Sequence, residues 1–572
     1  MNKKILIIFV LVTLLYVPLS ASPRYSLFEA ANLIKREYQE NKLTLDQKCL
    51  YLIYALRNHQ NLPQRFKILK EEEWKCGTPI VIEVKKNWDN LSLETKEEIN
   101  QLLARPDKPF IYRTTNFVIH YDTAGEYPVY HPWEDVDPVD GVPDYVNRVG
   151  EFMERSWYVE IDSMGYYAPP FDGTAGGDSL YDVYIDVPYG YAAPEEPSSQ
   201  YPDRPYATTS YIDVGNDMRI PRYPDDPLPF CKATCCHELF HACQFVFTGQ
   251  IGIYDEDYTS WLYEASSNWI EESVWDELND VYYYLNSYLP VSYQSLYHES
   301  GRHMYASWIW NQYLSENFGR DILHSIWLKY METFACAAVD SVLGRDFGTT
   351  MNDQFQEFAV WNWFTNGKDD GNHYSEGVFF FPQDTVVYIA THSSYPASQT
   401  ISGSYAAESY GANYVLFDPS SADTGTYELT FSGESQFVYG VDLILHDLSG
   451  YSYLKMDLDG TTSGNLLIPD FKDYDKVIMV VTHLFNFPER YGPASYSYNL
   501  NKYAGLLRGD ANGDGAINSA DVVYLINYLF KDGPEPDPWE AGDVNCDGTI
   551  NSADVVYLIN YLFKGGPPPG CP

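Results

Sequence analysis

The sequence predicts a multidomain protein with an α+β central domain, a β-sandwich domain and a small α-helical C-terminal module. Its 572 residues are too many for a single hydrophobic core. Apolar residues recur with the helical period of about 3.6 over much of the first half, whereas a period of about 2 dominates after residue 375. An acidic pattern occurs twice near the C-terminus, each time before an apolar helix-like run. The expected segments are 1–21, 22–110, 111–374, 375–505 and 507–572.

The first segment has the features of a secretory signal peptide. Lys3 and Lys4 precede the apolar run 5–17, and small residues follow up to Ala21. No other stretch approaches the roughly 20 apolar residues of a membrane-spanning helix. We therefore expect a secreted protein with no membrane span after signal removal. The net charge of −43, from 37 basic and 80 acidic residues, argues against nucleic acid as a partner.

The next two segments differ in their expected secondary structure. Segment 22–110 is predicted to be helical, with helices at 27–38, 45–59 and 91–103, the last capped by Ser92. Segment 111–374 mixes both types, with strands at 115–121 and 182–187 and helices at 143–162, 231–248, 260–277, 302–317 and 321–332. This mixture predicts an α+β domain behind a helical N-terminal region.

Segment 375–505 is predicted to form a β-sandwich. Short strands with alternating apolar residues are expected at 414–417, 427–431 and 476–481. Turns rich in Gly, Asp and Ser separate them, which is typical of two packed antiparallel sheets. The sequence does not distinguish an adhesive domain from a spacer.

The C-terminal segment contains two calcium-loop patterns, offset by 33 residues. Oxygen-bearing side chains recur at loop positions 1, 3, 5, 9 and 12, position 6 is Gly, and position 7 offers a backbone carbonyl, as a hard cation requires. The expected ligands to calcium are Asp510, Asn512, Asp514, Ala516, Asn518 and Asp521 in the first copy, and Asp543, Asn545, Asp547, Thr549, Asn551 and Asp554 in the second.

This repeat closely resembles the EF-hand-like type I dockerin module over nearly all of 507–572. Shared features are Asp at loop position 12, the helix after each loop and a Pro-rich spacer. The resemblance implies two Ca²⁺ ions and a cohesin domain as partner. It also assigns cohesin contacts to Ser519-Ala520 and Ser552-Ala553, whose identity suggests binding in two orientations.

A candidate zinc site lies in the expected helix 231–248. His237-Glu238-Leu239-Phe240-His241 is an H-E-x-x-H pattern, in which residues i and i+4 of a helix present both imidazoles to one metal ion. Neutral imidazoles suit Zn²⁺, and Glu238 can act as the general base towards a water molecule. The alternative is a helix with two ordinary histidines and a surface glutamate.

The third zinc ligand is expected from the following helix. Metzincins place Gly and His at the third and sixth residues after the second histidine, where this chain has Gln244 and Phe247. Glu264-Ala265-Ser266-Ser267-Asn268 is instead similar to the Glu-x-x-x-Asp element of thermolysin-like gluzincin peptidases. That resemblance implies a zincin-like fold, with Glu264 as the third ligand and Asn268 holding a ligand histidine. Fallback ligands are Glu256, Glu271 and Glu272, which otherwise would be solvated acids.

Gluzincins often supply a Tyr or His to the oxyanion of the transition state. Tyr305 and His303, near the start of an expected helix, are the preferred candidates; Tyr263 and His298 are others. The central region, roughly 115–330, also resembles uncharacterised secreted bacterial proteins with a predicted zinc-peptidase domain. The shared features are the acidic segment before residue 146, the H-E-x-x-H helix and the Trp-x-x-Glu helix.

Two further patterns have open interpretations. Lys75-Cys76-Gly77-Thr78-Pro79 resembles the latch of some metallopeptidase propeptides, in which a thiolate fills the open zinc position; a Cys49–Cys76 disulfide is the alternative. An acidic cluster of Asp135, Asp137, Asp140 and Asp144 is a candidate structural calcium site or a capped helix start. Cys231, Cys235, Cys236 and Cys243 on the expected motif helix are interpreted as packing residues.

Together these patterns predict a secreted zinc metallopeptidase that attaches through its dockerin to a cohesin-bearing partner. Water would attack a peptide carbonyl polarised by zinc, with Glu238 moving the proton to the leaving amine. The alternatives are a dockerin-borne polysaccharide-degrading enzyme and a non-catalytic cohesin-binding extracellular protein.

Overall fold

The computed structural model describes residues 26–69, 75–249, 260–299, 301–333, 335–460, 462–485, 492–503 and 505–570. The predicted signal peptide and Glu256 lie outside these ranges. The chain groups into two compact units. The first comprises the chain up to Glu154, Phe171–Glu196 and Thr209–Glu238, and the second comprises Arg155–Pro170, Pro197–Thr208 and Leu239–Pro572. Each unit therefore combines parts of more than one predicted segment.

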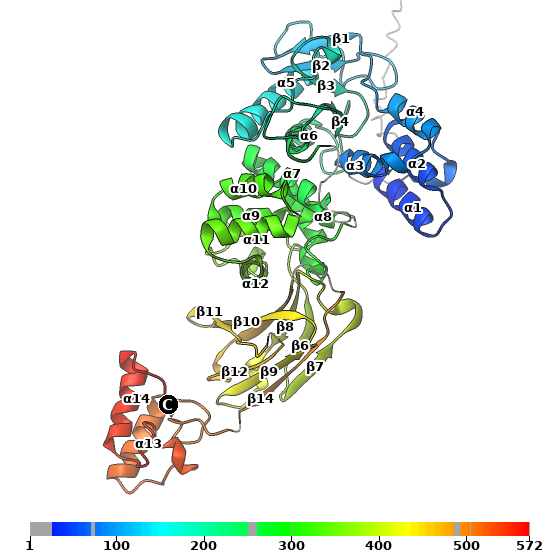
Figure 1. Cartoon of the computed structure of the whole chain (residues 1–572). Coiled ribbons are helices and arrows are strands. Elements are labelled where there is room, and N and C mark those ends of the chain that lie inside the picture. The colour runs from blue at the N-terminus through cyan, green and yellow to red at the C-terminus, as the bar shows by residue number, and fades with distance from the viewer. Residues whose placement is uncertain are drawn as a thin grey trace, which may run out of the picture. The chain divides into compact units, whose positions relative to one another are not determined.

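Helices open the described part of the first unit (Figure 1): α1 (Leu27–Gln39), α2 (Leu45–Arg57), α3 (Thr78–Lys86) and α4 (Leu93–Leu102). Side-chain caps begin α1, α2 and α4, as the sequence predicts for Ser92, whose Oγ accepts the Thr95 N–H at 3.3 Å. The sequence did not predict α3, because Ile80-Val81-Ile82 is a β-branched run typical of strands. Pro79 in its first turn favours the helix that forms.

A mixed five-stranded sheet, in the order β1-β2-β3-β5-β4, follows these helices. Its strands are β1 (Phe110–Arg113), β2 (Phe117–Tyr121), β3 (Tyr181–Ile185), β4 (Tyr191–Pro197) and β5 (Thr208–Val214). β2 pairs antiparallel with β1 and parallel with β3, and β3 pairs parallel with β5. The strand order puts β4 at one edge of the sheet. The sheet and the N-terminal helices share one hydrophobic core that includes Leu56, Val81, Tyr184 and Tyr191.

Helix α5 (Asp144–Trp157) continues into a π-helical turn, Tyr158–Ser163. Helix α6 (Leu228–Thr248) carries the H-E-x-x-H pattern and is continuous across the division of the two units, which falls after Glu238. Most described residues of α6 are fully buried, including Cys231, Cys235, Cys236 and Cys243. The four thiols therefore pack inside the protein, as predicted.

Helices also dominate the beginning of the second unit. They are α7 (Ser260–Val274), α8 (His303–Ala306), α9 (Trp308–Phe318), α10 (Asp321–Tyr330), α11 (Ala335–Val342) and α12 (Met351–Trp361). The single helix predicted at 302–317 is thus two helices, interrupted at Ser307. The Ser307 Oγ donates to the carbonyls of Leu296 at 2.8 Å and His303 at 3.1 Å, and such bonding to the carbonyl four residues back bends helices.

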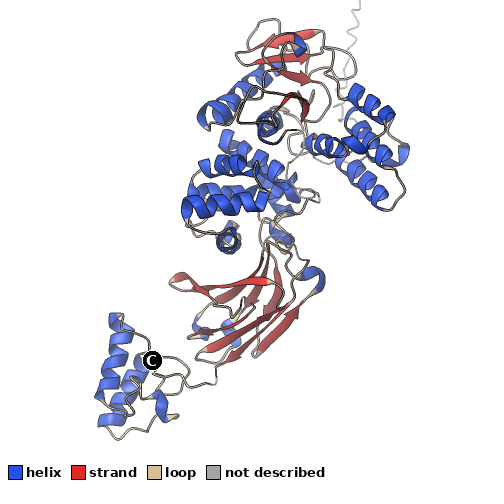
Figure 2. Cartoon of the chain, in the orientation of Figure 1, coloured by secondary structure: helices blue, strands red, loops and turns tan. Residues whose placement is uncertain are grey.

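The predicted β-sandwich is present as two sheets, with strand orders β11-β10-β13-β8-β6 and β12-β9-β14-β7 (Figure 2). The strands of the first sheet are β6 (Tyr388–His392), β8 (Gly411–Phe417), β10 (Val438–Asp447), β11 (Gly450–Lys455) and β13 (Lys476–Leu484). Those of the second are β7 (Ala397–Ile401), β9 (Tyr427–Gly433), β12 (Ser463–Ile468) and β14 (Tyr496–Lys502). Inward residues of both sheets, such as Val415 and Leu429, form one core.

Two helices, α13 (Ser519–Phe530) and α14 (Ser552–Lys564), complete the chain. They pack through Val522, Leu525, Val555 and Leu558 into a small separate core. Among the described residues, no helix has the length and apolar character needed to cross a membrane.

Candidate metal sites

The H-E-x-x-H residues occupy the buried middle of α6. His237, Glu238 and His241 are each 0% exposed, so the alternative of a surface glutamate is wrong. A carboxylate is buried at such cost only where protons, hydrogen bonds or cations compensate it. Glu238 Oε2 accepts a hydrogen bond from Thr78 Oγ1 at 2.9 Å, and the thiol of Cys76 lies 3.5 Å from the same oxygen.

Glu264 on α7 faces His241; its role as the third zinc ligand, which the gluzincin resemblance implies, stays a prediction. His241 Nε2 lies 3.3 Å from Glu264 Oε1, and Glu264 is 0% exposed. The other ring nitrogen, Nδ1, lies 2.7 Å from the amide oxygen of Gln244, whose own nitrogen donates to the Tyr263 carbonyl at 3.0 Å. This amide orientation assigns the proton to Nδ1, so the Nε2 lone pair points at the Glu264 carboxylate. Two electron-pair donors facing each other are the arrangement that a metal cation stabilises.

The residue that orients His241 differs from the one expected. Asn268 was expected to hold a ligand histidine, but its Nδ2 donates to the Tyr305 carbonyl at 3.0 Å. Gln244 contacts His241 instead, because it lies one turn further along the same helix and has the longer side chain. The sequence does indicate this contact, because Gln244 follows His241 by three residues on one helix. From the sequence alone, Gln244 served only to exclude the metzincin class.

Cys76 completes a group of four potential ligands. One ligand atom from each of Cys76, His237, His241 and Glu264 lies within 4.8 Å of the others, and all four residues are buried. Cys49 and Cys76 are both thiols, so the alternative Cys49–Cys76 disulfide is wrong. Sulfur, two imidazoles and a carboxylate form a donor set that zinc accepts, and the residues therefore fit the predicted metal.

The two candidates for an oxyanion donor lie on α8. Both ring nitrogens of His303 contact backbone carbonyls, Nδ1 that of Ser287 at 3.1 Å and Nε2 that of Ser295 at 3.0 Å. Burial lowers the pKa of His303 to about 3, so its ring is uncharged at neutral pH. Tyr305 is 2% exposed, and its backbone carbonyl ties α8 to Asn268 of α7. The roles of Tyr305 and His303 as oxyanion donors both stay predictions.

The fallback ligands Glu271 and Glu272 are 2% and 6% exposed, so the expectation that they are solvated is wrong. Glu272 belongs to a second carboxylate group with Asp276 and Glu376, whose oxygens lie within 4.8 Å of one another. Tyr282 donates to Glu272 Oε1 at 3.3 Å and also to Glu376. Burial and the neighbouring carboxylates raise the pKa of Glu272 to about 9, so this carboxyl holds a proton at neutral pH.

The acidic cluster before α5 forms a compact loop. The Asp135 carboxylate accepts the N–H groups of Asp140 at 2.9 Å and Gly141 at 3.0 Å, and Asp144 Oδ1 accepts those of Val136 and Asp137. Asp137 also pairs with Arg148 at 3.1 Å. These bonds account for the capped helix start; whether the loop binds calcium stays a prediction.

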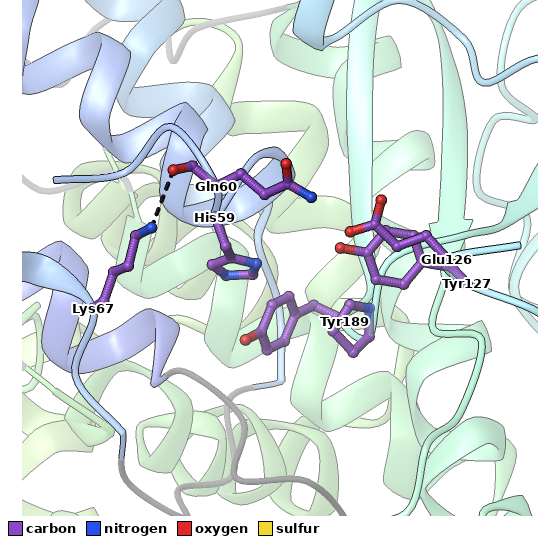
Figure 3. A pocket seen from close by; sticks show the side chains of 7 residues that line it. His59, Gln60, Lys67, Glu126, Tyr127 and Tyr189 are labelled. Atoms are coloured by element: carbon purple, nitrogen blue, oxygen red, sulfur yellow. Dashed lines mark hydrogen bonds between the residues drawn. The ribbon is translucent and has the colours of Figure 1, made fainter. Parts of the chain in front are cut away.

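A cavity of about 300 Å³ lies in the first unit, and Figure 3 shows the side chains that line it. Its lining residues are His59, Gln60, Lys67, Glu126, Tyr127, Pro188 and Tyr189. Lys67 Nζ donates to the Gln60 carbonyl at 3.0 Å, and burial with Glu126 nearby raises the pKa of Tyr127 to about 12. The cavity contains no residue of the H-E-x-x-H group, so it is separate from the predicted catalytic site.

Both C-terminal loops have the geometry of calcium loops. The carboxylate at position 1 accepts two backbone N–H groups: Asp510 those of Asp514 and Gly515, and Asp543 those of Asp547 and Gly548, at 2.8–3.2 Å. Gly515 and Gly548 have φ of +86° and +83°, a conformation that glycine adopts without strain. The chain therefore folds each loop inward, around its oxygen atoms.

The residues at loop position 12 are buried at the start of the following helix. Asp521 and Asp554 are 0% exposed, and Asn518 and Asn551 cap the same helices through their side chains. Burial, with added repulsion from neighbouring carboxylates, raises the pKa of Asp521 to about 6 and that of Asp510 above its usual value, because each buried anion needs a compensating positive charge. A cation among these oxygens would supply that charge, and the donor set fits calcium.

Comparison with known proteins supports the C-terminal assignment directly. Residues 508–563 match the family model described as the dockerin type I domain. Residues 225–442, which include α6, α7 and the first strands of the sandwich, match a family of unknown function, DUF6055. No curated protein matches the chain. Among solved structures, the pre-peptidase C-terminal domain of a collagenase from Bacillus anthracis is similar over 20% of this chain and 97% of that chain, with 13% identity and a TM-score of 0.15.

A type I dockerin binds calcium and docks onto a cohesin domain, and the loop geometry described above agrees with that family match. The C-terminal residues 508–563 of this chain are therefore a type I dockerin domain, which makes the chain a calcium-binding, cohesin-binding extracellular protein.

Proposed function

We propose that this protein is a secreted zinc metallopeptidase that its dockerin attaches to a cohesin-bearing partner. The observation that carries the proposal is the buried group of His237, His241, Glu264 and Cys76, whose ligand atoms lie within 4.8 Å of one another beside Glu238. Two imidazoles and one carboxylate with an adjacent glutamate are the protein contribution to a gluzincin-type site.

A zinc ion held there would activate a water molecule and polarise the peptide carbonyl. In this mechanism Glu238 accepts a proton from that water and transfers it to the amine that leaves. Gln244 keeps His241 in the tautomer that offers Nε2 to the metal, since its amide oxygen lies 2.7 Å from Nδ1. Tyr305, and less directly His303, are the candidates to donate to the developing oxyanion.

Strand β4 is the candidate element for aligning a peptide substrate in this proposal. Gly190, just before this edge strand, approaches α6 so closely that a Cβ atom would lie 2.3 Å from Thr234 Cγ2 and 2.8 Å from Glu238 Oε1. An edge strand offers backbone groups to an extended peptide, which then pairs with it as an additional strand. A substrate paired with β4 would pass directly over the general base.

The test of this proposal combines zinc analysis with digestion of a peptide library by the wild-type chain and Glu238→Gln. Both are also prepared with Cys76→Ala, because Cys76 lies at the same site. We expect one zinc per chain in every variant and a fall in turnover of about 10²–10⁴ in Glu238→Gln, because the base alone is removed. Glu151→Gln, an exposed carboxylate on α5, serves as the control. Zinc binding without turnover of any peptide in any variant would show a non-catalytic cohesin-binding protein.

A second candidate function is glycan binding or hydrolysis, favoured by a groove of about 590 Å³ in the second unit. Trp361, Tyr451 and Tyr453 line it together with the carboxylates of Glu357 and Asp370. Aromatic faces can stack on sugar rings, and paired carboxylates bind hydroxyl groups or act as acid and base.

For this groove we expect Tyr453→Ala to weaken retention of the chain on insoluble polysaccharides by about tenfold, since an exposed aromatic platform is lost. Tyr405→Ala is the matched control, because Tyr405 is an exposed tyrosine outside the groove. Equal retention of both variants, or no retention of the wild type on any polysaccharide tested, would exclude this function.

A further inference from the structure

The segment Cys76–Thr78 enters the predicted catalytic site and engages two of its functional groups. Cys76 Sγ is one of the four clustered ligand atoms, and it lies 3.5 Å from Glu238 Oε2. Thr78 Oγ1 donates to the same Glu238 oxygen at 2.9 Å. Cys76 and Thr78 are 0% exposed. The segment therefore approaches the other potential metal ligands to within 4.8 Å and contacts the general base, far in sequence from both.

The backbone fixes this segment on the sheet. Gly77 N–H donates to the Gly190 carbonyl at 2.7 Å, and Cys76 forms a parallel bridge with Gly190. The Ala192 N–H donates to Thr78 Oγ1 at 2.8 Å. These bonds use backbone groups at the beginning of β4, where a peptide substrate would pair.

Gly77 allows the close approach. A Cβ atom at this position would lie 2.5 Å from Leu56 Cδ1 and 3.2 Å from Tyr191 Cβ, and both neighbours are fully buried. A larger residue has to displace the Leu56 side chain or shift the segment relative to β4. The glycine between the cysteine and the threonine is thus tightly surrounded, and it offers a variant that disturbs the segment without changing either functional side chain.

The N-terminal helices anchor the segment firmly. Helix α3 begins at Thr78 and belongs to the hydrophobic core that α1–α4 share with the sheet. Arg57 of α2 adds ion pairs to Asp186 at 2.9 Å and Asp213 at 3.0 Å. Because α3 follows directly after this segment and is packed in that core, residues 76–78 stay in the predicted catalytic site without a separate binding partner.

A closed four-ligand zinc site is inert as a hydrolytic centre, because catalysis needs one open position for water or substrate. We infer that residues 76–78 are an inhibitory plug: the Cys76 thiolate is the fourth zinc ligand, and Thr78 holds Glu238 away from its role as a base. Zinc binding then replaces the S–H bond with a Zn–S bond and releases one proton to water. The intact chain is a latent form, and turnover requires the plug to leave. This inference rests on the proposed peptidase function.

The first experiment identifies the ligands without using activity. X-ray absorption at the zinc edge is recorded on the full-length, zinc-loaded chain and on Cys76→Ala. We expect one sulfur neighbour at about 2.3 Å in the wild type, replaced by nitrogen or oxygen in Cys76→Ala. Cys49→Ala, which removes another buried thiol of the N-terminal helices, should leave the sulfur neighbour in place.

The second experiment measures turnover of a peptide library by the same full-length chains. Cys76→Ala and Gly77→Ala should each raise turnover at least about tenfold, because either change opens the fourth position. Thr78→Val, which keeps the shape but removes the hydroxyl, should raise it further in the Cys76→Ala background. Addition of Glu238→Gln should cancel each gain.

The outcomes separate the plug from the peptidase. Sulfur ligation in the wild type with a gain in Cys76→Ala and Gly77→Ala supports the plug. A wild-type zinc shell without sulfur, in a chain that digests peptides, overturns the plug and leaves the peptidase standing. Sulfur ligation with no turnover in any variant identifies a structural zinc centre and overturns both. Absence of bound zinc in folded protein also overturns both.

Discussion

Chains carrying both Asp521→Ala and Asp554→Ala will not be captured by type I cohesin domains, and each single variant will bind one calcium ion where the wild type binds two. Each aspartate lies at 0% exposure at the start of its helix. The Asp554 carboxylate accepts three backbone N–H groups, those of Val544 at 2.8 Å, Asn545 at 3.1 Å and Asn551 at 2.8 Å. Removing this carboxylate takes away a metal ligand and the bonds that close the loop.

The effect on docking is expected to be large because metal binding and folding are linked in small modules. Helices α13 and α14 share one small core, so a loop that no longer closes around calcium leaves its helix without support. We expect the affinity of the double variant for cohesin to fall by at least about 10³-fold, which corresponds to roughly 4 kcal/mol. Binding of the full-length chain to a panel of immobilised cohesin domains, with calcium titration by calorimetry, measures both quantities.

Glu540→Gln provides the control, because Glu540 is an exposed acid of the same module outside both loops. It should bind two calcium ions and keep its cohesin affinity. If the double variant bound cohesin as tightly as Glu540→Gln does, calcium would have no part in docking. A single variant that retained cohesin binding would agree with the two orientations that the duplicated Ser-Ala pairs suggest.

The sequence was most informative where one short segment contains the whole arrangement. In the calcium loops, spacing alone places the ligands, since the twelve residues of each loop turn around one centre, and the N–H groups of Gly515 and Gly548 bond back to position 1 as that spacing requires. The same holds for His237 and His241, which the helical repeat aligns. Strand alternation likewise predicted the two-layered sandwich, because a sheet with one buried face repeats every second residue.

The sequence was least informative where contacts join distant segments. The latch resemblance around Cys76 pointed to the metal site but left a Cys49–Cys76 disulfide open, because local sequence cannot show that Cys76 meets Glu238, which follows 162 residues later. Helix α3 was missed because its apolar residues are β-branched, although packing in the shared core overrides that preference. The role of Gln244 was missed because a family resemblance directed attention to Asn268, whereas side-chain reach on α6 decides which residue touches His241.

Glu264→Ala and Gln244→Ala will both weaken zinc binding, and the loss will be larger for Glu264→Ala. Asn268→Ala will leave zinc binding little changed. Glu264 faces His241 Nε2 at 3.3 Å and supplies a ligand directly. The binding free energy of structural zinc sites is about 10–16 kcal/mol for four ligands. Loss of one ligand therefore costs roughly 3 kcal/mol, which lowers the affinity for zinc by about a hundredfold or more. Gln244 acts through the ring of His241, and loss of such a partner costs about 10- to 100-fold. Asn268 contacts the Tyr305 carbonyl instead, so its loss should affect stability rather than zinc affinity.

The measurement is competition with a chromophoric chelator, made in the Cys76→Ala background so that the thiol does not mask the loss of another ligand. Glu332→Ala, which removes an exposed carboxylate paired with Lys329, is the control for Glu264→Ala. Equal affinity in these two variants would remove Glu264 from the metal site and end the gluzincin interpretation. A loss in Asn268→Ala as large as that in Gln244→Ala would instead show that the family pattern, and not the reach of Gln244 along α6, determines how His241 is held. The order of the three affinities thus decides whether local helix geometry or family resemblance is the better guide to this site.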